Sequence, residues 1–225
     1  MRTLNKEDQE RISPQQALEI LKEGNKRFVQ NLKMNRNLLE QVNLTRDGQW
    51  PFAAILSCID SRTSAELIFD QGLGDIFSIR IAGNIINDDI LGSMEFACKV
   101  AGSKFIVVLG HTKCGAIKGA CDHVQLGYLS GLLEKIQPAV NAETSTKENR
   151  TSSNSYFVEE VSRINVEQTV EQVLAKSPVL RELVEQGKIG IAGAMYDVTS
   201  GKVEFYEHTL IMKSEEQVPQ KTSVA

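Results

Sequence analysis

The run PFAAIL, residues 51–56, is an unbroken apolar stretch that follows a proline, and the fold is built outward from it. Two further runs are similar to it: IFSIRI at 76–81 and FIVVLG at 105–110. Such runs are typical of strands covered on both faces, as in a parallel sheet. Helical patterns separate them, at 65–69 and 91–100. Strand, helix and strand in this order predict an α/β fold.

Further helices and strands are predicted before residue 51 and after residue 110. Ser13 and Pro14 form a helix start with a capping hydroxyl and a proline in the first turn. The predicted fold is a central, mostly parallel sheet of four strands plus a C-terminal antiparallel edge strand, flanked by helices, with an N-terminal helical arm. The expected further helices are at about 13–30, 116–124, 131–140 and 166–185 with a break at Ser177-Pro178, and the last two strands are at 188–196 and 204–206.

Length and composition favour one domain, expected over residues 1–212, with a polar tail at 213–225 expected to be disordered. Lys and Arg total 25 against 29 Asp and Glu, and no block of like charge could follow a phosphate backbone, so a nucleic-acid partner is not expected. The first residues match neither a secretory signal nor a transit peptide, and no stretch is long enough to span a membrane. Four cysteines are too few for a disulfide framework, which predicts a cytoplasmic protein.

Two short clusters carry the chemistry, Cys58-Ile59-Asp60-Ser61-Arg62 and His111-Thr112-Lys113-Cys114. Each follows a predicted strand, and ligands of α/β sheets lie beyond the carboxyl ends of strands. Two thiols and an imidazole can hold zinc and leave the fourth tetrahedral position for water or a nearby carboxylate. An open fourth position distinguishes a catalytic zinc from a structural one.

Each residue also has a simpler interpretation. Cys58 alone fits a buried core cysteine, and Cys98 and Cys121 are expected to be core. Asp60 fits a helix cap, but Thr63-Ser64-Ala65-Glu66 is expected to form a capping box of its own, which leaves Asp60 for Arg62 to hold. A phosphatase loop is excluded, because it needs five residues between Cys and Arg and this chain has three.

From about residue 24 to about 206 the chain resembles the β-class carbonic anhydrases. The motifs that carry this resemblance are Cys58-x-Asp60-x-Arg62, Gly72-x-Gly74-Asp75-Ile76-Phe77, Arg80-x-Ala82-Gly83-Asn84, Glu95-Phe96-Ala97 and Gly110-His111-x-x-Cys114-Gly115. The resemblance implies reversible hydration of carbon dioxide to bicarbonate and a proton by metal-bound hydroxide. It implies zinc ligands Cys58, His111 and Cys114, with Asp60 and Arg62 as the catalytic dyad.

The resemblance also implies a substrate pocket at a dimer interface. Gln49 and Phe77 match the glutamine and phenylalanine of that pocket, Gly115 belongs to it, and Phe96 stands where plant-type members have a tyrosine. The arm at about 10–45 is expected to pack on a partner subunit, in a homodimer or a larger assembly such as a tetramer.

Asp60 can also become the fourth zinc ligand in a closed state of this family. One group of members closes at lower pH and has a tryptophan three residues before the first ligand cysteine, where this chain has Ile55. The resemblance therefore implies the open type, with water on the zinc near neutral pH.

Two other functions remain open at this point. Related enzymes with the same metal site hydrolyse carbon disulfide or a similar small molecule. A noncatalytic scaffold protein stabilised by zinc would need only the ligands, and the presence of Asp60, Arg62 and Gln49 argues against it.

Overall fold

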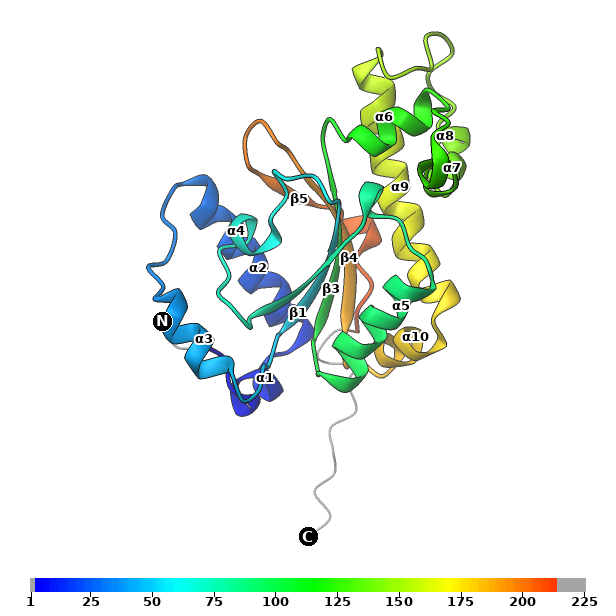
Figure 1. Ribbon diagram of the computed structural model, residues 1–225. Coiled ribbons are helices and arrows are strands. Elements are labelled where there is room, and N and C mark those ends of the chain that lie inside the picture. The colour runs from blue at the N-terminus through cyan, green and yellow to red at the C-terminus, as the bar shows by residue number, and fades with distance from the viewer. Residues whose placement is uncertain (1–2, 214–225) are drawn as a thin grey trace.

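The computed structural model describes residues 3–213, and within them a five-stranded sheet lies between helices on both faces (Figure 1). Except for Lys213, the predicted disordered tail lies outside the described residues. The strands, in the spatial order β2-β1-β3-β4-β5, are β1 (Ala53–Ser57), β2 (Ile76–Arg80), β3 (Phe105–His111), β4 (Gly190–Tyr196) and β5 (Val203–Phe205). Neighbouring strands are parallel except for the pair of β4 and β5. The predicted fold class is confirmed.

The central strands are apolar throughout because helices cover both of their faces. Every residue of β1 and β3 is buried. Ile55 points to the layer that holds Leu18 of the N-terminal helix, whereas its neighbour Leu56 points to the opposite layer with Val166 and Val170. Each such side chain contributes about 1.5–3 kcal/mol of burial free energy. The unbroken run at 51–56 is thus explained by two cores, one on each side of the sheet.

The expected helices occur in the expected order, although several bounds differ, and the helices at 6–11 and 38–45 were not expected individually. The helices are α1 (Lys6–Arg11), α2 (Pro14–Val29), α3 (Leu38–Thr45), α4 (Ala65–Ile68), α5 (Asp88–Glu95), the π-helix η2 (Phe96–Val100), α6 (Gly115–Cys121), α7 (Gly127–Glu134), α8 (Gln137–Ala142), α9 (Ser155–Lys176) and α10 (Pro178–Glu185), with short 3₁₀ turns η1 (Ala82–Asn84) and η3 (Glu207–Thr209). α2 begins as predicted, because Ser13 caps it reciprocally with Gln16. None of the helices within residues 3–213 has the length and apolarity needed to cross a membrane.

Two helical expectations were wrong in extent. The helix expected at 131–140 is two helices, α7 and α8. The helix expected from 166 starts at Ser155, where Asn154 supplies the cap. Its first turns bury polar as well as apolar side chains, including Ser162 and Asn165, so hydropathy alone did not show a helical stripe.

Candidate metal centre

The strand order places the ends of β1 and β3 side by side at a topological switch point. From β1 the chain crosses to β2 on one side, whereas β3 is followed by β4 on the other. In open α/β sheets, ligands bind beyond the carboxyl ends of the strands at such a point. Cys58 directly follows β1, and His111 is the last residue of β3. The fold therefore brings the two predicted clusters together.

The side chains of Cys58, His111 and Cys114 converge on one point. All three are buried, and their ligand atoms lie within 4.8 Å of one another. The two sulfur atoms are 4.0 Å apart. Zinc binds thiolate sulfur at about 2.3 Å in a tetrahedron, which places two sulfurs about 3.8 Å apart. The observed spacing fits a zinc ion.

The imidazole of His111 is oriented to bind a metal through Nε2. Its Nδ1 lies 2.9 Å from the carbonyl oxygen of Thr112. A carbonyl oxygen only accepts hydrogen bonds, so Nδ1 carries the proton and Nε2 keeps a lone pair. Nε2 is buried and has no hydrogen-bond partner in the described part of the chain. An unsatisfied buried polar atom costs about 1–3 kcal/mol, and a metal bonded to Nε2 would remove that cost.

A tight turn lets His111 and Cys114 face the same point. Lys113 has a φ of 58°, in the left-handed region, which turns the chain sharply between the two ligands. Cys114 then occupies the N-cap position of α6. The positive end of the helix dipole favours thiolate over thiol at this position.

The two thiols lie within hydrogen-bonding distance of each other, so each affects the pKa of the other. The hydrogen bond that Cys58 shares with Cys114 lowers the pKa of Cys58, and the backbone N–H of Gly83, 3.4 Å from the Cys58 sulfur, acts in the same direction. The pKa of Cys114 is raised, first by the hydrogen bond with Cys58 and then by burial, and these effects outweigh the backbone N–H groups at the start of α6. One thiolate therefore forms readily, and the second proton is released when a cation binds.

Arg62 holds both carboxylate oxygens of Asp60. Its Nε donates to Oδ1 at 2.9 Å and its Nη2 to Oδ2 at 2.7 Å. The side-chain hydrogen bonds from Arg62 keep the pKa of Asp60 well below its usual range, although burial opposes them. Oδ2 lies 3.9 Å from Nε2 of His111. The carboxylate thus lies beside the point where the ligand atoms converge and is tethered to the guanidinium group.

Two residues that the sequence reasoning did not assign to the site brace the turn that carries Asp60. Thr63 donates its hydroxyl hydrogen bond to the carbonyl oxygens of Cys58 at 3.1 Å and Asp60 at 2.8 Å. Arg80 donates to the same two oxygens, from Nε at 3.1 Å and from Nη2 at 2.6 Å. Arg80 ends β2, the strand next to β1, and that adjacency is the signal that could have found it.

The bonds of Thr63 also correct an expectation about helix α4. The capping box expected at 63–66 does not form. The N-cap of α4 is Ser64, whose side chain makes no capping hydrogen bond. Thr63 instead satisfies the backbone of the metal-binding turn, so a residue expected to cap a helix supports the site.

The predicted pocket residues fall into two groups. A cavity of about 250 Å³ adjoins Cys58 and Asp60, and Gly115 lines it together with apolar residues such as Leu129. Phe77 and Phe96 are outside this cavity; their rings contact edge to face, 6.2 Å apart, in a separate groove. Gln49 is exposed and lines neither. A single chain therefore brings only Gly115 of these four to the metal cluster.

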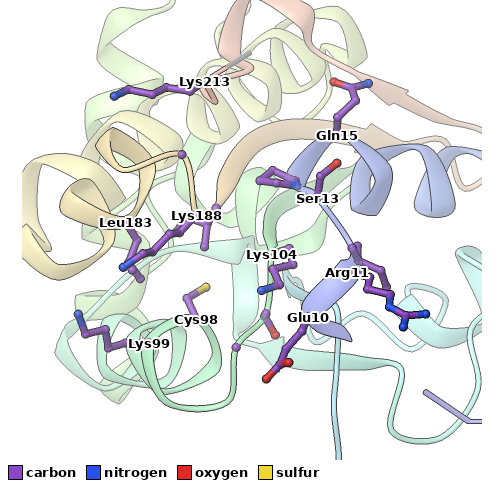
Figure 2. A pocket seen from close by; sticks show the side chains of 16 residues that line it. Glu10, Arg11, Ser13, Gln15, Cys98, Lys99, Lys104, Leu183, Lys188 and Lys213 are labelled. Atoms are coloured by element: carbon purple, nitrogen blue, oxygen red, sulfur yellow. The ribbon is translucent and has the colours of Figure 1, made fainter. Parts of the chain in front are cut away.

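A larger cavity, of about 590 Å³, lies at the opposite, amino end of the strands (Figure 2). Lysines surround it, including Lys104, just ahead of β3, and Lys188, just ahead of β4. Cys98 lines it and is buried, and burial raises the pKa of its thiol to about 12. None of the predicted site residues lines this cavity, and Cys98 and Cys121 are both core residues as expected.

Comparisons with known proteins agree with this geometry. A family model described as carbonic anhydrase matches residues 53–203. The chain is 36% identical over 203 residues to carbonic anhydrase 2 of Mycobacterium tuberculosis, which covers 87% of this chain and 94% of that relative. Among solved structures it is similar to the β-carbonic anhydrase CcaA, with a TM-score of 0.67, 26% identity and coverage of 88% of this chain and 92% of that one. It is also similar to the β-carbonic anhydrase CafA of Aspergillus fumigatus, with a TM-score of 0.66, 25% identity and coverage of 79% and 84%.

Proposed function

Because this chain belongs to the β-class carbonic anhydrases, zinc enzymes that interconvert carbon dioxide and bicarbonate, we propose that Asp60 and Arg62 are its catalytic pair. The zinc site consists of Cys58, His111 and Cys114. The observation that carries the function is the convergence of two thiols on a histidine whose Nε2 is buried and unpaired. Bound there, zinc lowers the pKa of water and so supplies a nucleophile near neutral pH.

Asp60 orients the attacking oxygen in this proposal. Arg62 fixes both of its carboxylate oxygens, yet Oδ2 remains 3.9 Å from Nε2 of His111 and beside the cluster. A fixed carboxylate can accept the hydrogen of that oxygen and so direct its lone pair toward carbon dioxide. The same ion pair restrains Asp60 from reaching the metal itself, which supports the open arrangement expected from Ile55.

The cavity beside Asp60 suits the substrate. Its lining combines Gly115 with Ile59, Ala82 and Leu129, and all of these lack a polar side-chain group. An apolar wall accepts a neutral gas without the cost of desolvating polar groups. Gly115 leaves space, because a Cβ atom built there would meet no atom within 4 Å.

We also propose that the enzyme is at least a homodimer and that Gln49, Phe77 and Phe96 complete the pocket across the interface. The arm leaves large apolar side chains in water: Leu38 is 55% exposed and Leu39 72% exposed. Phe96 is 52% exposed. Large apolar side chains exposed at adjacent positions, such as Leu38 and Leu39, are typical of an interface. Sedimentation equilibrium is expected to give at least twice the chain mass of 24.9 kDa, and a monomer would contradict the assignment.

Stopped-flow measurement of carbon dioxide hydration, with zinc analysis on the same preparation, tests the function. The zinc form is expected to hydrate carbon dioxide, with bicarbonate dehydration as the reverse reaction. Carbon disulfide serves as the competing substrate in parallel assays. Turnover of carbon disulfide without hydration of carbon dioxide would assign the related hydrolase activity, and zinc binding without either turnover would indicate a scaffold protein.

We propose a cytoplasmic location as well. All four cysteines are buried free thiols, and none of them forms a disulfide. Free thiols are stable in a reducing compartment. Fractionation of the source cells checks this location, and recovery of the protein outside the cytoplasm would contradict it.

A further inference from the structure

The zinc-binding turn is joined to a hairpin at the far end of the chain. The turn between β4 and β5 starts at Asp197, and it lies against Thr112, the residue between His111 and Lys113. Thr112 donates its hydroxyl hydrogen bond to Oδ1 of Asp197 at 3.3 Å. The same hydroxyl accepts a hydrogen bond from the backbone N–H of Val198 at 3.1 Å. Thr112 is thus held through its side chain as well as its backbone.

This contact matters because Thr112 also sets the geometry of His111. The carbonyl oxygen of Thr112 accepts the Nδ1 hydrogen bond of the ring, and no other partner of Nδ1 is present in residues 3–213. The backbone N–H of Thr112 donates to the carbonyl oxygen of Tyr196 at 3.0 Å. The position of the Thr112 carbonyl oxygen therefore decides the tautomer of His111 and the direction in which its Nε2 points.

Asp197 is itself fixed, so it can act as an anchor. Its carboxylate accepts hydrogen bonds from the Ser200 hydroxyl at 2.6 Å and from the Thr199 backbone N–H at 2.9 Å. These bonds lower the pKa of Asp197 to about 2, so it is ionised at working pH. The turn also contacts α2, because Gly201 accepts a hydrogen bond from Asn25 at 3.0 Å.

We propose that Thr112 and Asp197 are positioning residues for His111, which fix its ring so that Nε2 points at the zinc. This inference rests on the proposed function, since it takes His111 as a zinc ligand. Groups that hydrogen-bond behind metal-binding histidines typically change metal affinity or activity by about 10–100-fold. Here the link has two steps, from the Asp197 carboxylate to the Thr112 hydroxyl and from the Thr112 carbonyl to the ring.

Thr209, in η3 just after the same hairpin, provides a matched control. Its hydroxyl accepts the backbone N–H of Gly193 at 2.8 Å and donates to the carbonyl oxygen of Tyr206 at 2.7 Å. It therefore performs a similar structural task without contact to His111. Replacement of either threonine by valine removes one hydroxyl and leaves a backbone N–H without its partner, so both variants should lose stability to a similar degree.

The experiment compares Thr112→Val, Thr112→Ser and Thr209→Val in the zinc-loaded, full-length protein. Zinc release into an excess of a chromogenic chelator is expected to be about 10-fold faster for Thr112→Val than for wild type. Thr112→Ser keeps the hydroxyl and should restore the wild-type rate. Thr209→Val should lower the urea midpoint without changing zinc release. With cobalt in place of zinc, the visible absorption bands should shift in Thr112→Val only.

Asp197→Ala is a second variant, which tests the same link with Thr112 unchanged and so does not require the Thr112→Val protein to fold correctly. It should also accelerate zinc release, and the double variant with Thr112→Val should release zinc no faster than Thr112→Val alone, because the two residues act in series. Equal zinc release from wild type, Thr112→Val and Asp197→Ala would overturn the inference. Wild-type protein that holds zinc but does not hydrate carbon dioxide would instead overturn the proposed function, and the comparison of zinc release would still stand.

Discussion

Replacing Cys58 by alanine is expected to remove zinc from the protein and to reduce carbon dioxide hydration by at least about 10³-fold, because water with an unshifted pKa of about 15.7 supplies almost no hydroxide at neutral pH. Cys58 is one of three converging ligands, and its sulfur lies 4.0 Å from that of Cys114. Without it, two protein ligands remain for an ion that ordinarily takes three or four. Zinc content by atomic absorption and stopped-flow hydration are measured on the same sample.

Cys98→Ala is the matched control for this variant. Cys98 is also buried and also a free thiol, but it lies in the core below the opposite end of the strands. Its replacement should cost stability through the small cavity it leaves, while one zinc per chain and full hydration activity remain. Zinc loss from both variants alike would show that any buried thiol change disrupts the fold, and the ligand assignment would lose its support.

Replacing Asp60 by asparagine is expected to reduce hydration by about 10²–10⁴-fold while zinc stays bound. Both carboxylate oxygens accept hydrogen bonds from Arg62, and an amide presents only one acceptor to the guanidinium group. The neutral side chain then neither holds its orientation nor accepts the hydrogen of the attacking oxygen as strongly as a carboxylate. The measurement is the hydration rate at a fixed, verified zinc content.

The chain offers a second Asp–Arg pair as a control. Arg46 donates to Asp47 at 3.0 Å, and both side chains are exposed. Asp47→Asn should leave hydration unchanged, since exposed pairs contribute about 0–1 kcal/mol to stability and this one lies apart from the metal cluster. Full activity in Asp60→Asn would refute the catalytic role proposed for that carboxylate.

The sequence was most informative where local pattern and long-range packing agree. The apolar run at 51–56 predicted a strand with two covered faces, and β1 is buried on both. The His111-x-x-Cys114 spacing predicted two ligands on one turn, and the left-handed Lys113 provides that turn. The identity of the ligands follows from residue chemistry. The ligands lie close together because β1 and β3 are parallel, so their carboxyl ends lie at the same edge of the sheet.

The sequence was least informative where a side chain from one segment forms hydrogen bonds that support a turn in another segment. Thr63 looked like a helix cap, whereas it bonds the carbonyl oxygens of the metal-binding turn. Arg80 supports the same turn from the neighbouring strand, and Asp197 supports Thr112 from a hairpin. Such contacts depend on register and loop conformation, and no periodicity in the sequence encodes them. The roles assigned to Gln49, Phe77 and Phe96 remain predictions, since they concern a second subunit.

The switch point between β1 and β3 also governs the order in which the enzyme becomes able to hold its metal during synthesis. Cys58 and Cys114 are separated by 56 positions, so the ligand set is complete only when the third strand has been made and has docked beside the first. Thr112 and Asp197 are 85 positions apart, so the anchor of the histidine arrives much later. Long-range contacts of this kind form slowly, because loop closure must come first. During synthesis the three ligands, all within the first 114 residues, are therefore made well before the hairpin that carries Asp197.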